Sequence, residues 1–220
     1  MRDMKPKVLY HTLSGSQLTG LTAPTSDLDT LSVVAYPMDC YLGLVGYSES
    51  THDKTGANDV LVHELRKFAK LAMVGNYACL SSLFAPESKV LTMHNAFRPF
   101  VTNAFAFVSK KAVSACVGQA LTDYRTAVAD YANNTKVAAR SYHLMDEARR
   151  MLEYGSPGVD ASWIAKQLRA GELPLSVFQN EFEVLREEVK YLEKGDYLRA
   201  TVHAGFVSDL TMDALVASIL

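Results

Sequence analysis

Residues 14–29 read SGSQLTGLTAPTSDLD and carry the strongest structural signal in this sequence. A β-branched, apolar segment precedes the Gly15-Ser16 pair and predicts a strand that ends there. A loop must follow around Pro24, because proline fixes φ and keeps the residue before it out of the helical region. Residues 27–36 are again apolar and predict the next strand. The stretch is thus typical of two strands joined by a short helical turn and a loop.

Two acidic residues, Asp27 and Asp29, stand at the start of the second predicted strand. Side chains at positions i and i+2 of a strand project to the same face, so we expect the two carboxylates side by side. Like charges placed in this way repel each other unless a cation lies between them. Acidic oxygen ligands suit Mg²⁺, which keeps waters and substrate phosphates as its other ligands. Gly15 would let the backbone approach a polyphosphate, and the Ser16 hydroxyl could donate to it.

The composition bounds the class of protein. The 220 residues are 49% hydrophobic and 21% charged, which argues against a disordered chain. A net charge of −2 excludes a strongly basic nucleic-acid coat. No apolar run approaches the roughly 18 residues of a membrane span, and no secretory signal is recognisable at the N-terminus. The cysteines are odd in number and widely spaced, which favours reduced thiols and a cytoplasmic protein: Cys40, Cys79 and Cys116.

The rest of the N-terminal part predicts two more short strands and one helix. Residues 40–46 and 60–64 have strand-like composition, whereas the polar residues 48–58 between them predict a loop. A helix should follow, because apolar side chains recur on one face at Leu65, Phe68, Leu71 and Ala72.

The remaining chain is predicted to be helical. Apolar residues or caps mark five segments, at residues 110–131, 136–154, 160–169, 174–192 and 208–220, with Asp160 and Ser208 as expected caps. We therefore expect the α+β class. A small mixed β-sheet core over residues 1–90 should pack against a helical C-terminal region over residues 91–220.

The residues quoted above resemble the signature of a known superfamily. Gly15-Ser16, ten residues and then Asp27-Leu28-Asp29 is similar to the signature of the DNA polymerase β-type nucleotidyltransferases. Three more segments resemble the subgroup called RNA-repair-pathway polymerase-β-like nucleotidyltransferases, which includes phage members: DVLVHELRKFAKLA (59–72), LFAP (83–86) and, less closely, KVAARSYHLMDEARRMLEYG (136–155). The resemblance therefore covers residues 8–155, and it implies a nucleotidyltransferase core in the sheet.

The resemblance implies an enzyme and a role for each matching residue. A nucleotidyl group would pass from an NTP such as ATP to a hydroxyl acceptor, with Mg²⁺ or Mn²⁺ as cofactor. The acceptor would be an RNA end in repair or modification, a protein hydroxyl or a small molecule. Asp27 and Asp29 would be catalytic metal ligands, with Asp59 as the third carboxylate and Glu64 as its alternative. The nucleotide-binding candidates are Gly15, Ser16, Ser26, Lys67, Lys136 and Arg140.

Other interpretations stay open at this point. Asp59 could instead cap a strand or helix after Asn58, and Glu64 could form a surface ion pair with Lys67 or Lys70. His143 shares a helix face with Lys136 and Arg140, so it could point into the same cleft. The alternative function is a catalytically inactive nucleotidyltransferase fold that binds or inhibits an RNA or a protein partner. The two adjacent aspartates argue against it, because a protein without a metal has no evident use for neighbouring like charges.

Overall fold

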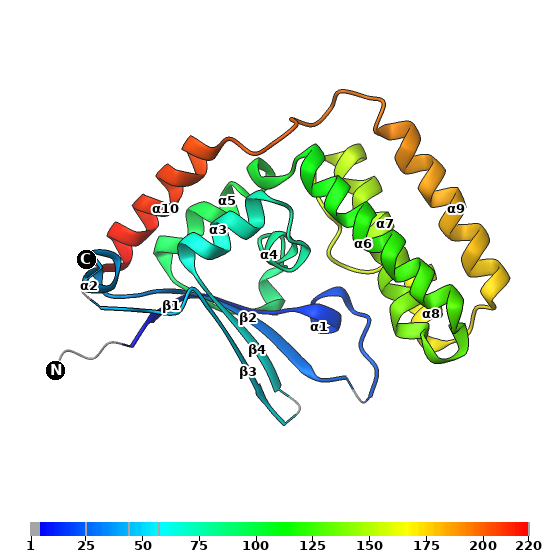
Figure 1. The fold of residues 1–220 in the computed structure, drawn as a ribbon, viewed down its shortest axis with the longest axis horizontal. Helices are drawn as coiled ribbons and strands as arrows, with labels where there is room; N and C mark the ends of the chain where they lie inside the picture. Colours follow the sequence, from blue (N-terminus) through cyan, green and yellow to red (C-terminus); the bar gives the residue numbers. More distant parts are fainter. Residues whose placement is uncertain (1–4, 25, 44, 57, 220) are drawn as a thin grey trace.

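The computed structural model of the chain describes residues 5–219 apart from residues 25, 44 and 57. Within this part, five strands form one mixed sheet in the order β3-β4-β2-β1-β5 (Figure 1). Only the β2–β4 pair is parallel among the described strands. The strands are β1 (Lys7–Leu13), β2 (Leu28–Ala35), β3 (Ser50–Thr55), β4 (Asn58–Glu64) and β5 (Val90–Met93).

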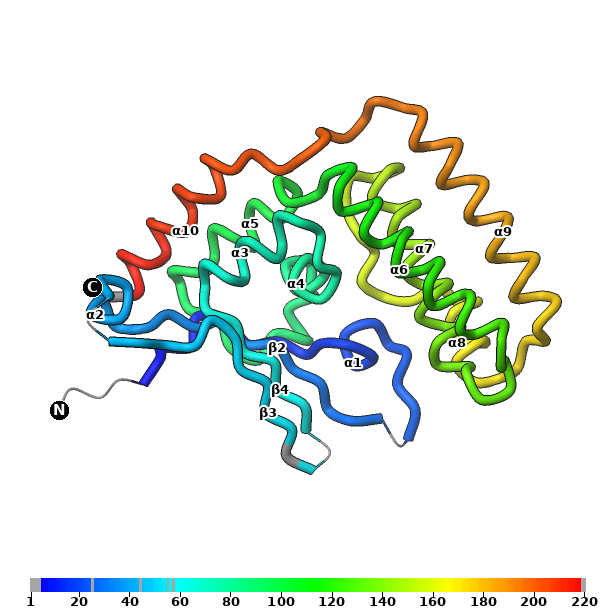
Figure 2. Tube along the Cα trace, viewed as in Figure 1, coloured from blue at the N-terminus to red at the C-terminus, as the bar shows by residue number. Residues whose placement is uncertain are grey.

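The described helices form two groups, and the C-terminal helix packs on the group near the sheet. Near the sheet are α1 (Gly15–Thr19), α2 (Met38–Tyr41), α3 (Leu65–Met73), α4 (Tyr77–Ser82) and α5 (Arg98–Thr102). Beside them lie α6 (Lys110–Ala129), α7 (Thr135–Tyr154), α8 (Trp163–Ala170) and α9 (Leu175–Leu192). The last helix, α10 (Ala204–Ile219), returns to α3 and α5, as the tube in Figure 2 shows. None of the described helices has the length and apolar character needed to cross a membrane.

The core of the sheet part includes a group of aromatic rings packed between the sheet and its helices. Helices α3, α4 and α5 lie on one side of the sheet (Figure 1). The Tyr10 ring of β1 stacks on Phe97 at 4.7 Å, and Phe97 stacks on Phe100 at 5.1 Å. Phe68 of α3 meets both phenylalanines edge-on. Burial of such large rings contributes about 1.5–3 kcal/mol each, so this stack holds the helices on the sheet.

The structure confirms the α+β class and the helical character of the C-terminal part. Two predictions near the N-terminus are wrong. Residues 38–41 form the helix α2, not a strand over 40–46, because Pro37 ends the extended segment and its carbonyl accepts from the Cys40 N–H. Residues 50–55 form β3, not a loop. This strand lies at the edge of the sheet and is exposed, so its polar sequence gave no strand signal.

Further differences concern β5 and two helix starts. Residues 90–93 pair with β1 and extend the sheet beyond the segments expected to form it. The α8 cap is Ser162, which accepts from the Ala165 N–H, whereas Asp160 forms an ion pair with Lys89 at 3.0 Å. The last helix begins at Ala204, before the expected Ser208. Four residues of the predicted elements and loops lie outside the described part: residue 25 in the loop predicted around Pro24, residue 44 in the strand predicted over 40–46, residue 57 in the loop predicted over 48–58, and residue 220 in the helix predicted over 208–220.

Candidate functional site

The turn after β1 requires a glycine. Gly15 has φ +52°, in the left-handed region that side chains disfavour. A Cβ atom at this position would lie 2.5 Å from Asp29 Oδ2, which is closer than any normal contact. The Ser14 N–H donates to the Asp29 carbonyl at 2.9 Å and fixes the turn against the start of β2. The absence of a side chain at Gly15 therefore leaves the Asp29 carboxylate accessible beside the turn.

Three carboxylates gather where β2 and β4 begin. The parallel register places Asp29 directly opposite Asp59, and paired residues of neighbouring strands project to the same face. Asp27 precedes β2 by one residue. Burial raises the pKa of Asp29, and the charges of Asp59 and Asp27 raise it further, while Lys136 and Lys54 lower it. This end of the sheet therefore carries an excess of negative charge.

The edge strand β3 supplies a lysine and a histidine as partners to this group. Lys54 pairs opposite Asp59 in the register, and its Nζ lies 4.0 Å from Asp27 Oδ2. His52 Nε2 forms a short hydrogen bond with Asp59 Oδ1. In this arrangement, the described residues hold no group of three His, Cys, Asp or Glu side chains close enough to bind a metal ion. The oxygen-only, acidic donors nevertheless fit Mg²⁺ in kind, and a cation there would relieve the mutual repulsion around Asp29.

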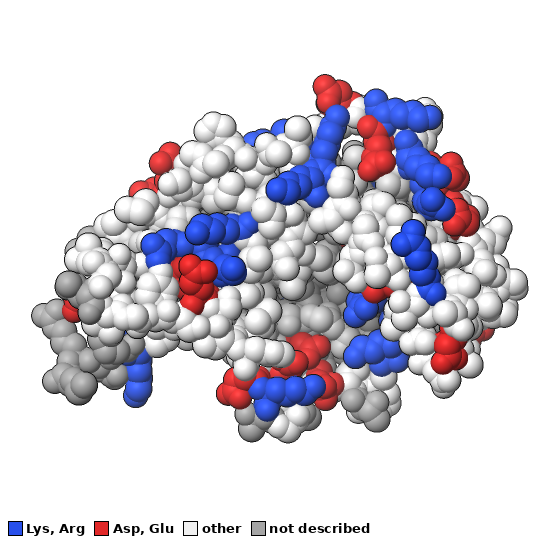
Figure 3. Space-filling view, viewed as in Figure 1, with Lys and Arg blue, Asp and Glu red and all other residues white. Residues whose placement is uncertain are grey.

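A cavity of about 380 Å³ opens beside Asp29, between α1, α4 and α7. Gly15 and Ser16 line it from α1, and Lys136 and Arg140 line it from α7. Residues four apart on a helix share a face, so both cations point to the same side of α7. Figure 3 shows acidic side chains gathered near the free ends of β3 and β4, with basic side chains facing them across a hollow. The cavity thus has a negative rim and cationic walls.

Arg140 is held in place by a residue that the sequence analysis missed. Its Nε donates to Asp123 Oδ2 at 2.6 Å and its NH2 to Oδ1 at 2.8 Å. Gln119 Nε2 donates to the same carboxylate at 2.9 Å. Asp123 is buried on α6, whereas about half of the Arg140 side chain is exposed. Such a bidentate pair fixes the plane of the guanidinium while it lines the cavity. The only sequence signal was a carboxylate within the apolar pattern of α6.

Other predicted site residues lie elsewhere. Glu64 ends β4, five residues from Asp59, and caps α3 by accepting from the Lys67 N–H at 3.3 Å. It also accepts from the Tyr41 hydroxyl at 3.0 Å, so it serves this buried cap rather than the carboxylate group. Lys67 Nζ lies 3.8 Å from Glu49 and does not line the cavity. The Ser26 hydroxyl accepts from the Ala23 N–H and stabilises the loop before Asp27.

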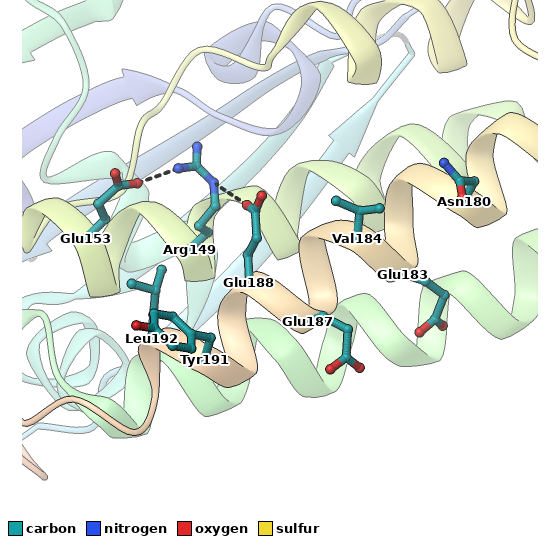
Figure 4. A pocket seen from close by; sticks show the side chains of 9 residues that line it. All are labelled: Arg149, Glu153, Asn180, Glu183, Val184, Glu187, Glu188, Tyr191 and Leu192. Carbon is teal, nitrogen blue, oxygen red and sulfur yellow. Dashed lines mark hydrogen bonds and ion pairs between the residues drawn. The ribbon is translucent and has the colours of Figure 1, made fainter.

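A larger, open groove of about 790 Å³ runs between α7 and α9 (Figure 4). Arg149 lies on one side of it and forms ion pairs with Glu153 and Glu188, as the dashed lines show. The groove contains no residue predicted to bind nucleotide or metal. We therefore take the smaller cavity beside Asp29 as the candidate site.

Comparison with known proteins identifies a family whose model matches most of the chain. The RlaP family, described as the RNA repair pathway DNA polymerase beta family, matches residues 1–145. No curated protein matches the sequence. Among solved structures, a nucleotidyltransferase-like protein from Exiguobacterium sibiricum is similar at 9% identity and a TM-score of 0.35, covering 98% of this chain and 83% of that chain. Because the family match spans well over half of the 220 residues, the chain belongs to the RNA repair pathway DNA polymerase beta family.

Proposed function

We propose that this protein transfers a nucleotidyl group from an NTP to a hydroxyl acceptor in a reaction that requires Mg²⁺ or Mn²⁺. The observation that carries the proposal is the register of β2 and β4, which sets Asp29 opposite Asp59 at the mouth of a cationic cavity. The site would lie between a nucleotidyltransferase core over residues 1–90 and the helical region over residues 91–220. Family membership supports the same class of reaction.

The carboxylates are the proposed metal ligands. Asp29 and Asp59, together with Asp27, would hold the cation with hard oxygen donors. When bound, the ion would supply charge neutralisation at the attacking and leaving oxygens. The chain itself keeps these carboxylates together through the β2–β4 register, and it keeps space beside them through Gly15. For the metal to bind, Asp59 would have to give up its hydrogen bond to His52, and Asp27 its ion pair with Lys54.

The cavity wall is the proposed triphosphate site. The Ser16 hydroxyl can donate to a phosphate oxygen, and Lys136 adds a mobile positive charge. Arg140 offers a fixed fork of N–H groups, because Asp123 already holds its orientation. These residues would place the α-phosphorus near Asp29. The acceptor oxygen would then bond to this phosphorus, the bond to the bridging oxygen would break, and pyrophosphate would leave as the hydroxyl proton is released.

An RNA end is the acceptor we propose first, in accordance with the family description. The test is incubation of the protein with each NTP, labelled at the α-phosphate, in the presence of total RNA, total protein and Mg²⁺ or Mn²⁺. We expect label in RNA, and none with Asp29→Asn, which keeps the shape of the side chain but not its charge. Label in protein would redirect the proposal to a protein hydroxyl.

One observation favours the alternative of an inactive binding protein. Two of the three carboxylates already have partners within the protein, His52 for Asp59 and Lys54 for Asp27, as a protein that never binds a metal would require. Under this alternative, no acceptor would become labelled, and RNA or a partner protein would bind equally well to the wild type and to Asp29→Asn. The labelling experiment therefore separates the two functions.

A further inference from the structure

The residues of α7 that line the cavity change from charged to uncharged along the helix. Lys136 and Arg140 lie at its outer end, near Asp29. Arg169 also lines the cavity, beside the turn after α1, where its Nε donates to the Leu21 carbonyl at 3.1 Å. Since a helix rises 1.5 Å per residue, His143 lies about 10 Å further along α7 than Lys136.

The inner end of the cavity holds no charged side chain among its described lining residues. It is lined by Tyr77 and Ser81 from α4, His143 and Leu144 from α7, and Leu18 from α1. The Tyr77 hydroxyl and His143 Nε2 are joined by a hydrogen bond of 2.8 Å. Their rings meet edge-on, with centroids 5.9 Å apart. The tyrosine hydroxyl is therefore held at a fixed place in the cavity wall.

Glu147 lies behind His143, and both side chains have buried polar atoms that form no hydrogen bond within the described part of the chain. Its Oε1 lies 3.9 Å from His143 Nδ1, beyond hydrogen-bond distance, and both side chains are almost fully buried. His143 Nδ1 and both carboxyl oxygens of Glu147 have no hydrogen-bond partner among the described residues. Buried polar atoms in folded proteins are rarely left in this condition.

Both groups are expected to be uncharged at neutral pH. Burial lowers the pKa of His143 to about 4 and raises the pKa of Glu147 to about 9. The nearby Arg150 opposes the shift of Glu147, and Asp146 reinforces it. A phosphate would find no cation among the described residues that line this end of the cavity, whereas a neutral ring with polar edges would find hydroxyl groups and apolar walls.

We propose that the inner end of the cavity, formed by Tyr77, Ser81 and His143, is the binding site for the nucleobase of the NTP. The assignment rests on the proposed function and adds to it the part of the substrate that discriminates between nucleotides. The Tyr77 and Ser81 hydroxyls would bond to ring nitrogens or exocyclic groups, and Leu18 and Leu144 would contact the faces of the ring. His143 would act as a positioning residue, because it holds the Tyr77 hydroxyl.

The test compares nucleotides with a ligand that has no base. Dissociation constants are measured by calorimetry, with Mg²⁺ present, for the four NTPs and for inorganic tripolyphosphate. Tyr77→Phe should weaken the best NTP about tenfold and reduce its preference over the other three, while tripolyphosphate binding stays within twofold. His143→Gln should reduce the same preference. The matched control is Tyr131→Phe, which removes a hydroxyl that donates to the Leu173 carbonyl at 2.7 Å outside the cavity.

A second variant guards against a folding defect, because Tyr77→Phe leaves His143 Nε2 without its partner. Ser81→Ala removes the other hydroxyl, and it should also weaken NTP but not tripolyphosphate. Equal weakening of both ligands, or unchanged NTP binding in both variants, would overturn the assignment. If the wild-type protein binds tripolyphosphate, and binds none of the four NTPs more tightly than tripolyphosphate, this assignment alone would be overturned. A wild type that binds neither would overturn the proposed function as well.

Discussion

Replacement of Glu147 by glutamine tests whether the carboxyl group behind the inner wall of the cavity is uncharged. Glu147 is fully buried, and burial raises the pKa of its carboxyl from about 4.5 to about 9. Between these two values, the folded protein keeps a proton that the unfolded chain releases. The free energy of unfolding of the wild type must therefore fall as the pH rises through this window. The glutamine of Glu147→Gln does not titrate, so the free energy of unfolding of the variant lacks this dependence on pH.

The size of the effect follows from one proton per molecule. Each pH unit within the window changes the wild-type stability by about 1.4 kcal/mol relative to the variant, so the difference should grow by about 2.7 kcal/mol from pH 6 to pH 8. The lowered pKa of His143 has the opposite effect on the free energy of unfolding: the stability that it contributes is lost as the pH falls from 6.5 toward 4. It is present in both proteins and largely cancels in the difference.

Urea denaturation followed by far-ultraviolet circular dichroism at pH 6, 7 and 8 measures this difference. Glu172→Gln is the matched control, because it makes the same substitution at an exposed position. We expect Glu147→Gln to gain stability over the wild type as the pH rises. A difference that stays constant over this range would refute the reasoning, since it would mean that Glu147 is ionised in the folded protein.

Three substitutions test the outer part of the site. Gly15→Val should lower the melting temperature and abolish NTP binding in a titration, because the added Cβ would lie 2.5 Å from the Asp29 carboxylate; tight NTP binding would contradict this. Ser16→Ala should remove one hydrogen bond to a charged group, about 1.5–3 kcal/mol, and weaken NTP roughly ten- to a hundredfold; unchanged affinity would show that the turn does not contact phosphate. Asp123→Asn should free Arg140 and weaken both NTP and tripolyphosphate in calorimetry, unless the guanidinium is oriented by other contacts.

The sequence predicts the parts of the site that local patterns encode. Gly15 and the Asp27-Asp29 spacing are local, and the structure places them at one turn and one strand start. The apolar face of α3 is local as well. These features follow from chain geometry over a few residues, so no tertiary contact was needed to find them.

The features of the site that the sequence did not predict depend on tertiary contacts. The strand β3 is polar because it lies at the sheet edge, so its role in placing His52 and Lys54 beside the carboxylates was not predictable. Asp123 acquires its role only when α6 packs against Arg140 of α7. Glu64 could not be assigned, because a carboxylate at a strand end can equally serve as a helix cap, which is what the structure shows.

The central claim is that the carboxylates at the start of β2 and β4 support transfer of a nucleotidyl group. The most direct measurement uses one NTP labelled either at the α- or at the γ-phosphate, with Mg²⁺ and the acceptor found by the labelling experiment. We predict that the α-label enters the acceptor, that the γ-label leaves as pyrophosphate, and that Asp29→Asn and Asp59→Asn each abolish transfer while the melting temperature changes little. Transfer of the γ-label, or full activity in either variant, would contradict the account.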